Sequence, residues 1–192
     1  MSVLCQSGMS DILKNFMLKQ WKTLTSKIHF KNPWWTYKID EYQIPDGIQG
    51  EYHFVHTLGS SMVVPVTAQG KIILVNQYRY LCNKESIELP CGGVKEGKSY
   101  EEMAHLELEE ETGHRAKSLN YAAEFNPYNG ITNEMCRVYI ARQLYETETK
   151  PDATEEFEIF FLTPKEIDSM IESNQIWDGM TIAAWRLVRN KL

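Results

Sequence analysis

The sequence has few cysteines and no pair of them at the spacing of a metal or redox site. Its four cysteines, Cys5, Cys82, Cys91 and Cys136, are widely scattered, so neither a zinc site nor a disulfide framework is indicated. This pattern predicts a reducing, cytoplasmic location. No run is apolar and long enough to cross a membrane, and the N-terminus lacks a basic-then-apolar export signal, so no membrane partner is expected.

Basic residues are also scarce. Lys and Arg number 20 against 26 Asp and Glu, which gives a net charge of -6 over 192 residues and predicts no nucleic-acid partner. Apolar residues make up 43% and charged residues 24%, which is typical of a globular protein and sufficient for one well-buried domain. An acidic protein that binds an anionic substrate must do so through a local cation or a metal.

Two kinds of hydrophobic periodicity run along the chain. From about Asp11 to Ile28 the apolar residues repeat at helical spacing, which predicts an amphipathic helix packed on the protein's own body, with membrane contact as the alternative. From Trp34 the pattern changes to short β-rich runs, and the turn sequence Pro45-Asp46-Gly47 predicts a hairpin.

The remaining runs predict an alternation of strands and helices. Extended segments are expected at 60–68, 71–80, 137–145 and 157–163, and helices at 100–112, 164–173 and 181–189. This order predicts an α/β fold: an α/β/α sandwich with a mixed sheet, preceded by the N-terminal helix and a small β subdomain. The corresponding domains are 1–57 and 58–192.

The segment around the first of these central helices is the most informative. A Gly-rich loop at 92–97 precedes Ser99, which forms a capping box with Glu102, so the helix should start at Tyr100. Gly113 sits where a helix commonly ends in a left-handed residue.

Three carboxylates share one face of this helix. Glu110 and Glu111 fall within about 60° of Glu107 at helical spacing, on the side that the apolar residues mark for burial, whereas Glu109 and Thr112 fall on the water-facing side. A solvated acidic surface is the alternative interpretation. Like charges at this spacing cost roughly 0.2–0.5 kcal/mol per pair, and no Lys or Arg occupies a neighbouring helix position. The pattern therefore favours a hard divalent cation, Mg²⁺ or Mn²⁺.

These residues resemble the Nudix box, G-x5-E-x7-R-E-U-x-E-E-x-G-U, in which U is a bulky apolar residue. The positions that match in register are Gly92, Glu107, Leu108, Glu110, Glu111 and Gly113. From about Trp34 onward the chain is similar to the ADP-ribose pyrophosphatase branch, with "VNQYRY" before the box, "ELPCGG" entering it and "NGITNE" after it. The resemblance implies metal-dependent hydrolysis of a nucleoside diphosphate linked to a sugar, with ADP-ribose giving AMP and ribose 5-phosphate.

The box departs from the pattern at three positions. Lys98 stands in place of glutamate, Leu106 in place of arginine, and His114 in place of an apolar residue. In the family the missing glutamate and arginine pair with each other, so the loss of both leaves neither unpaired. A diverged active enzyme and a catalytically silent nucleotide sensor both remain open, as do dinucleoside polyphosphates or nucleoside triphosphates as substrates.

The resemblance also implies roles for individual residues. Glu107, Glu110, Glu111 and the Cys91 carbonyl would hold the metal, and Glu155 or Glu156 would be the catalytic base, a polar turn being the alternative. The substrate-binding candidates are Arg79, Glu88, Trp34, Trp35, Asn129 and Glu134. For Arg79 the alternative is an ion pair at a strand end, and for the tryptophans it is packing. The resemblance further implies a homodimer.

Overall fold

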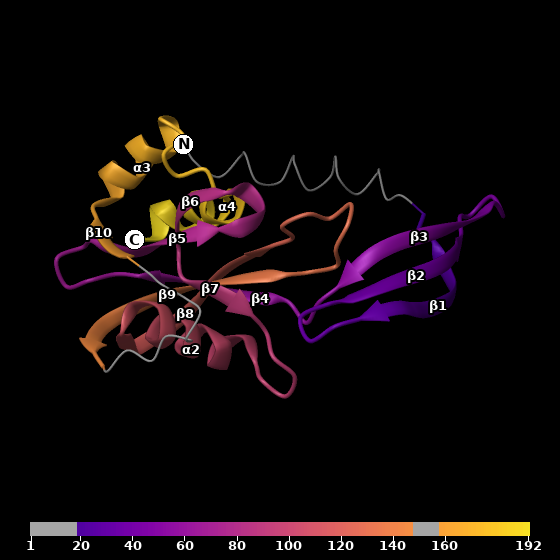
Figure 1. The fold of residues 1–192 in the computed structure, drawn as a ribbon, viewed down its shortest axis with the longest axis horizontal. Helices are drawn as coiled ribbons and strands as arrows, with labels where there is room; N and C mark the ends of the chain where they lie inside the picture. The colour runs from indigo at the N-terminus through magenta and orange to yellow at the C-terminus, as the bar shows by residue number, and fades with distance from the viewer. Residues whose placement is uncertain (1–18, 148–157) are drawn as a thin grey trace, which may run out of the picture. The chain divides into compact units, whose positions relative to one another are not determined.

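Strands outnumber helices in the structure, a computed structural model that describes residues 19–147 and 158–192. The strands are β1 (Lys22–Lys31), β2 (Thr36–Gln43), β3 (Gln49–His56), β4 (Ser60–Pro65), β5 (Ile72–Arg79), β6 (Lys84–Glu88), β7 (Cys91–Gly93), β8 (His114–Phe125), β9 (Cys136–Glu146) and β10 (Glu158–Leu162). The helices are α2 (Tyr100–Thr112), α3 (Pro164–Glu172) and α4 (Gly179–Val188), with 3₁₀ turns η1 (Tyr80–Cys82) and η2 (Arg189–Lys191). The chain divides between Phe54 and Val55 into two units (Figure 1).

The first unit is a three-stranded sheet in the order β1-β2-β3. The predicted hairpin is confirmed: the N–H of Gly47 donates to the Ile44 carbonyl at 2.9 Å, and the N–H of Ile44 donates to the Ile48 carbonyl at 2.9 Å. Gly47 has a φ of +89°, a conformation that glycine adopts without steric cost.

The predicted helix from Asp11 to Ile28 is wrong in its second half. Residues 22–28 belong to β1, which pairs antiparallel with β2, for example Lys27 opposite Ile39. Thr23, Thr25 and Ile28 are β-branched residues, which favour a strand, and pairing with a neighbouring strand outweighs helical periodicity. Residues 11–18 of that prediction lie outside the described residues.

The second unit contains two sheets, with strand orders β10-β5-β6 and β7-β4-β9-β8. β4 and β9 run parallel and their other neighbours run antiparallel, so the predicted mixed sheet is confirmed. Figure 1 shows α2 on one side of this sheet and α3 and α4 on the other. No helix in the described ranges is long and apolar enough to cross a membrane.

Alternation along β4 explains the three layers. Met62 and Val64 point into a core shared with the C-terminal helices, where Ile167 and Trp185 are buried. Val63 points the other way, into a smaller core formed with Ala104 and Leu108 of α2 and with residues of β8 and β9. Successive side chains of a strand face opposite sides of its sheet, so one buried strand serves both cores and α2 is fixed against the sheet.

Besides β1, three strands were not predicted. The longest, β8, contains no valine, isoleucine or threonine and therefore carries little intrinsic β signal. It forms because it pairs with β9 along almost its whole length, from His114 opposite Glu146 to Phe125 opposite Cys136. The short strands β6 and β7 lie on either side of Pro90 and lead into the Gly-rich loop.

Candidate active site

Helix α2 has the predicted bounds and caps. The Ser99 hydroxyl accepts a hydrogen bond from the Glu102 N–H at 3.2 Å, and the Glu102 carboxylate accepts one from the Ser99 N–H at 2.8 Å. At the other end, Gly113 adopts the left-handed conformation with φ of +65°. These local bonds fix where the helix starts and stops and therefore where its glutamates project.

The buried face of α2 includes two of the three predicted ligands. Glu107 and Glu111 are buried, and Glu110 is half-buried. Thr112, predicted to face water, is also buried, because its hydroxyl donates to the Leu108 carbonyl at 2.5 Å and satisfies itself within the helix. The buried face of α2 therefore includes Thr112, one position more than the helical spacing predicts.

Glu107 touches the Gly-rich loop at Gly92. A Cβ built on Gly92 would lie 2.1 Å from Glu107 Oε1, far inside van der Waals contact. Gly92 is thus required by the close approach of the carboxylate to the backbone. The residue that matches the first glycine of the box leaves room for the residue that matches its glutamate.

Glu111 contacts the residue before Gly92, which is Cys91. Its Oε2 accepts a hydrogen bond from the Cys91 N–H at 3.3 Å. A hydrogen bond with Cys136, followed by burial and by the charges of Glu111 and Glu107, raises the pKa of the Cys91 thiol well above its ordinary value. The thiol is therefore neutral, and the main chain of Cys91 is the part that faces the carboxylates.

Arg79 and Glu88 form a two-point ion pair beside these glutamates. The Arg79 Nε donates to Glu88 Oε1 at 2.8 Å, and its Nη2 donates to Glu88 Oε2. The hydrogen bond with Glu88 is the main cause that raises the Arg79 pKa, and the charges of Asp178 and Glu111 add to it. Arg79 is thus a cation whose charge interacts with that of Glu111, although it lies outside α2, where the search of neighbouring helix positions did not reach.

Asp178 is a charged residue whose interaction with Arg79 the sequence interpretation missed. It caps α4, accepting a hydrogen bond from the Thr181 N–H at 2.7 Å, and its charge acts on both Arg79 and Cys136. The Asp-Gly pair at the start of the last predicted helix is an N-cap signal, but nothing in it indicates proximity to the box.

The loop from Asn126 to Glu134 places its two candidates differently. Glu134 is half-buried and held by hydroxyls: Ser60 Oγ donates to Oε1 at 2.7 Å, and Thr57 Oγ1 to Oε2 at 3.5 Å. Its charge acts on Cys136, the neighbour of Cys91. Asn129 is exposed in the same loop. Glu134 is therefore brought toward the site, and Asn129 lies on the surface.

The remaining candidates are the two tryptophans and the two predicted bases. Trp34 and Trp35 belong to the first unit; their N–H groups donate to Asn32 Oδ1 at 2.9 and 2.8 Å. Trp34 is 79% exposed, so it is not packed within the described chain, whereas Trp35 contacts the ring of Phe30. The two predicted bases, residues 155 and 156, lie outside the described residues.

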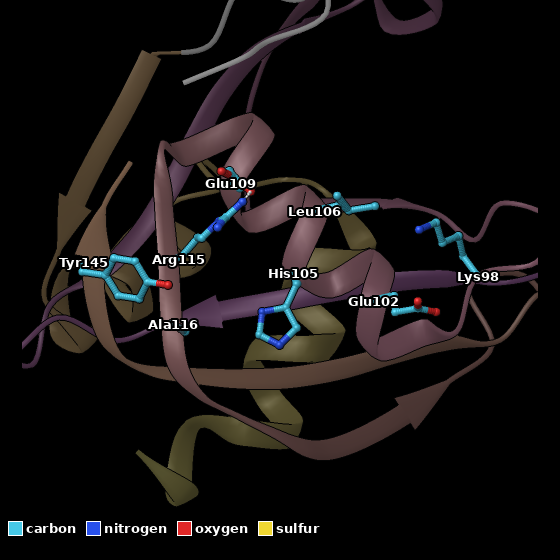
Figure 2. A pocket seen from close by; sticks show the side chains of 8 residues that line it. All are labelled: Lys98, Glu102, His105, Leu106, Glu109, Arg115, Ala116 and Tyr145. Carbon is cyan, nitrogen blue, oxygen red and sulfur yellow. Dashed lines mark ion pairs between the residues drawn. The ribbon is translucent and has the colours of Figure 1, made fainter. Parts of the chain in front are cut away.

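The departures from the box gather on the outer face of α2. Lys98 and Leu106 both line a shallow cleft of about 400 Å³ (Figure 2), whose full lining is Lys98, Glu102, His105, Leu106, Glu109, Arg115, Ala116 and Tyr145. Arg115 forms an ion pair with Glu109 at 2.8 Å across this cleft. The third departure, His114, donates from Nδ1 to the Thr112 carbonyl at 2.7 Å and packs its ring against Phe161.

The chemistry of the inner face suits a hard divalent cation. The carboxylate oxygens of Glu107 and Glu111 there are donors that Mg²⁺ and Mn²⁺ take. Gly92 provides a cradle that a side chain would fill. In the described part of the chain, no three His, Cys, Asp or Glu side chains converge into a ready-made cluster. Glu107 and Glu111 instead lie against the loop backbone, so the donors fit the metal without forming a closed cage.

Known proteins are similar to this chain in sequence. Residues 56–183 match the NUDIX domain. The chain is 30% identical over 155 residues to the ADP-ribose pyrophosphatase of Bacillus subtilis (strain 168), covering 80% of this chain and 84% of that protein. It is 29% identical over 149 residues to the methanol dehydrogenase activator of Bacillus methanolicus, covering 77% and 80%.

A solved structure described as an ADP compounds hydrolase has the same fold, with a TM-score of 0.80 at 20% identity over 92% of this chain and 96% of that one. The predicted resemblance to the ADP-ribose pyrophosphatase branch is thereby confirmed, together with the predicted α/β fold. The match to the NUDIX domain covers the Gly-rich loop, α2 and the start of α4. The chain belongs to the Nudix family of pyrophosphohydrolases.

Proposed function

We propose that this enzyme hydrolyses ADP-ribose to AMP and ribose 5-phosphate. The observation that carries the proposal is the contact between α2 and the Gly-rich loop: Glu107 against Gly92 and Glu111 on the Cys91 N–H, with the cation Arg79 close by. The name of the Bacillus subtilis relative supports ADP-ribose as the substrate.

The metal of the proposed reaction is Mg²⁺, with Mn²⁺ as a substitute. Glu107, Glu110, Glu111 and the Cys91 carbonyl would hold it, and when bound it would neutralise phosphate oxygens and lower the pKa of a water molecule. In the net reaction the oxygen of water forms a new bond to one phosphorus, and the bridging P–O bond breaks. The proton of the water passes to a carboxylate, for which Glu155 or Glu156 is our candidate.

Arg79 is the proposed phosphate-binding residue. Its guanidinium has five N–H donors, and the two bonds to Glu88 leave others for phosphate oxygens. Nearly half of its side chain is exposed. Glu88 would then orient the guanidinium, Glu134 would hold the loop of residues 126–134, and Asn129 would contact the terminal ribose.

The N-terminal subdomain, predicted as residues 1–57, is proposed to form a homodimer and to stack the base on Trp34 or Trp35. The exposed apolar side chains of the first unit support this, because such a surface is typical of an interface. They are Trp21, Leu24, Ile28, Phe30, Trp34 and Ile48. The free thiols of Cys82, Cys91 and Cys136 agree with the expected reducing, cytoplasmic location.

The test compares wild type with Glu111→Gln on a panel of nucleotide sugars with Mg²⁺, scoring AMP and sugar phosphate separately. We expect ADP-ribose to be the best substrate and Glu111→Gln to lower kcat on the order of 10²–10³-fold, the scale for losing one group that stabilises charge in a transition state. Glu109→Gln is the matched control, since it removes a charge on the outer face of α2, where Glu109 pairs with Arg115. Equal rates for wild type and Glu111→Gln would overturn the proposal.

Two other functions give different outcomes in the same panel. A dinucleoside polyphosphate or nucleoside triphosphate hydrolase would release products other than AMP and ribose 5-phosphate. A catalytically silent nucleotide sensor is favoured by one observation, the replacement of the paired box residues by Lys98 and Leu106. It would bind ADP-ribose tightly without turnover at any Mg²⁺ concentration.

A further inference from the structure

The five residues from Glu88 to Gly92 supply four groups to the candidate site. It supplies the carboxylate that orients Arg79, the backbone N–H that binds Glu111, the carbonyl proposed as a metal ligand, and the glycine against Glu107. A shift of this backbone would move all four groups together. What holds the segment in place therefore matters for the reaction.

Backbone bonds hold only part of this segment. The Pro90 carbonyl accepts a hydrogen bond from the Val63 N–H at 2.8 Å, and proline itself has no N–H to donate. Leu89 follows the last paired residue of β6, Glu88, and precedes Pro90, so its N–H lies outside the β5–β6 ladder. Leu89 is buried, so its N–H needs a partner other than water.

That partner comes from the far end of the chain. The Leu89 N–H donates at 3.1 Å to the hydroxyl oxygen of Thr181, which is 92 residues away in the first turn of α4 and 0% exposed. The Thr181 N–H in turn donates to Asp178, whose charge reaches Arg79 and Cys136. In the segment just before α4, Trp177 Nε1 donates to the Glu85 carbonyl of β6 at 3.0 Å. The turn before α4 is thus bonded to the strand that leads into the Gly-rich loop.

We propose that Thr181 is a positioning residue for the hydrolytic reaction: its hydroxyl holds Leu89 and so sets the places of Glu88 and Cys91 relative to α2. The bond lies outside the box and involves neither a predicted ligand nor a predicted substrate contact. A buried N–H that loses its acceptor regains a partner only if the backbone moves. Supporting partners of a metal site commonly change metal affinity by about 10–100-fold when they are lost. The inference rests on the proposed metal-dependent function.

The experiment uses the full chain and three variants. Thr181→Val keeps the shape and removes the acceptor, Thr181→Ser restores a hydroxyl, and Val188→Ala is a control that loosens the other end of α4 at an equally buried position. Amide hydrogen exchange of Leu89 and Mn²⁺ affinity, measured by electron paramagnetic resonance without nucleotide, are read beside kcat and KM. For Thr181→Val we expect faster Leu89 exchange, about tenfold weaker Mn²⁺ binding and a lower kcat at similar KM. Thr181→Ser should lie within a few-fold of wild type.

Two results would overturn the inference. One is a Thr181→Val protein whose Leu89 exchange rate and Mn²⁺ affinity match those of Val188→Ala. Each variant is measured the same number of degrees below its own melting temperature. The other is a Thr181→Ser protein no better than Thr181→Val. Should Thr181→Val not fold, Thr181→Cys, whose sulfur is a weak acceptor, must bind Mn²⁺ more weakly than both wild type and Val188→Ala. If wild type hydrolyses no nucleotide sugar, the proposed function fails, while the exchange of Leu89 still tests the role of Thr181.

Discussion

The Glu107 carboxylate lies where a side chain on Gly92 would begin. A Cβ at position 92 would be 2.1 Å from the Glu107 Oε1 and 2.5 Å from its Oε2. Gly92 has no left-handed backbone, so the requirement for glycine here is one of space and not of backbone conformation. The next residue, Gly93, has open space around the same position. Two adjacent glycines therefore differ in what a methyl group would do.

Gly92→Ala should lower activity strongly while Gly93→Ala should not. The added methyl group displaces the Glu107 carboxylate, and misplacement of a catalytic group by about 1 Å can cost on the order of 100-fold in rate. The measurement is kcat/KM for ADP-ribose with Mg²⁺, together with the melting temperature of each variant. Gly93→Ala should stay within a few-fold of wild type; a comparable loss in both variants would contradict the steric explanation.

The Arg79–Glu88 pair should show energetic coupling. Among the described residues, Arg79→Ala leaves the buried Glu88 carboxylate with the 3.5 Å contact from Gln77 alone. We therefore expect a loss of about 1–3 kcal/mol of unfolding free energy, reduced because Arg79 is half exposed. Arg79→Ala combined with Glu88→Gln should lose less than the sum of the single variants. Urea unfolding measures these energies. The exposed pair Lys27–Glu41 serves as a control whose coupling should be much smaller, because solvent screens it, and additive effects at Arg79 and Glu88 would refute the two-point bond.

Local signals in the sequence predict the catalytic helix well. The capping box at Ser99, the left-handed Gly113 and the glutamates at helical spacing are all encoded within about one helix length, so no distant contact is needed to place them. The same holds for the hairpin turn at Gly47. The one local error on this helix, Thr112, arose because a threonine can bond its own helix and then be buried.

Long-range contacts explain what the sequence could not predict. β8 has no intrinsic β preference and exists because β9 lies beside it. Residues 22–28 are a strand because β2 pairs with them, although their apolar spacing is helical. Asp178 and Thr181 reach the site only through a contact that spans 92 residues, which no local pattern can indicate.

Two capping glutamates should make folding stability depend on acid pH. A backbone hydrogen bond from Ser99 lowers the pKa of Glu102 below its usual 4.5, and a side-chain hydrogen bond from Thr163 lowers that of Glu166. A group with a lowered folded-state pKa adds stability above its unfolded pKa and loses it as the pH falls through the folded value. Below pH 4.5 the wild type should therefore lose more unfolding free energy than Glu102→Gln combined with Glu166→Gln, in which amides keep the capping boxes without titrating. Glu101→Gln, on the same turn of α2, is the control, and parallel pH curves for all proteins would contradict the assignment.

Lys98 and Leu106 together should be convertible back to an ion pair that buttresses α2. Both side chains line the cleft on the outer face of the helix, so a glutamate at 98 and an arginine at 106 would face the same space (Figure 2). Lys98→Glu alone adds a carboxylate near Glu102, and Leu106→Arg alone exchanges an apolar contact for an unpaired charge, so each single variant should gain nothing. The double variant should exceed the sum of the singles by about 0.5–3 kcal/mol in unfolding free energy, the range for residues in contact, and should raise kcat by steadying the helix that carries Glu107 and Glu111. Thermal unfolding and ADP-ribose turnover measure the two effects separately. Additive stabilities would mean that the two positions do not meet across the cleft, and a coupled stability without a change in kcat would mean that the lost pair supported the fold of α2 but not its chemistry.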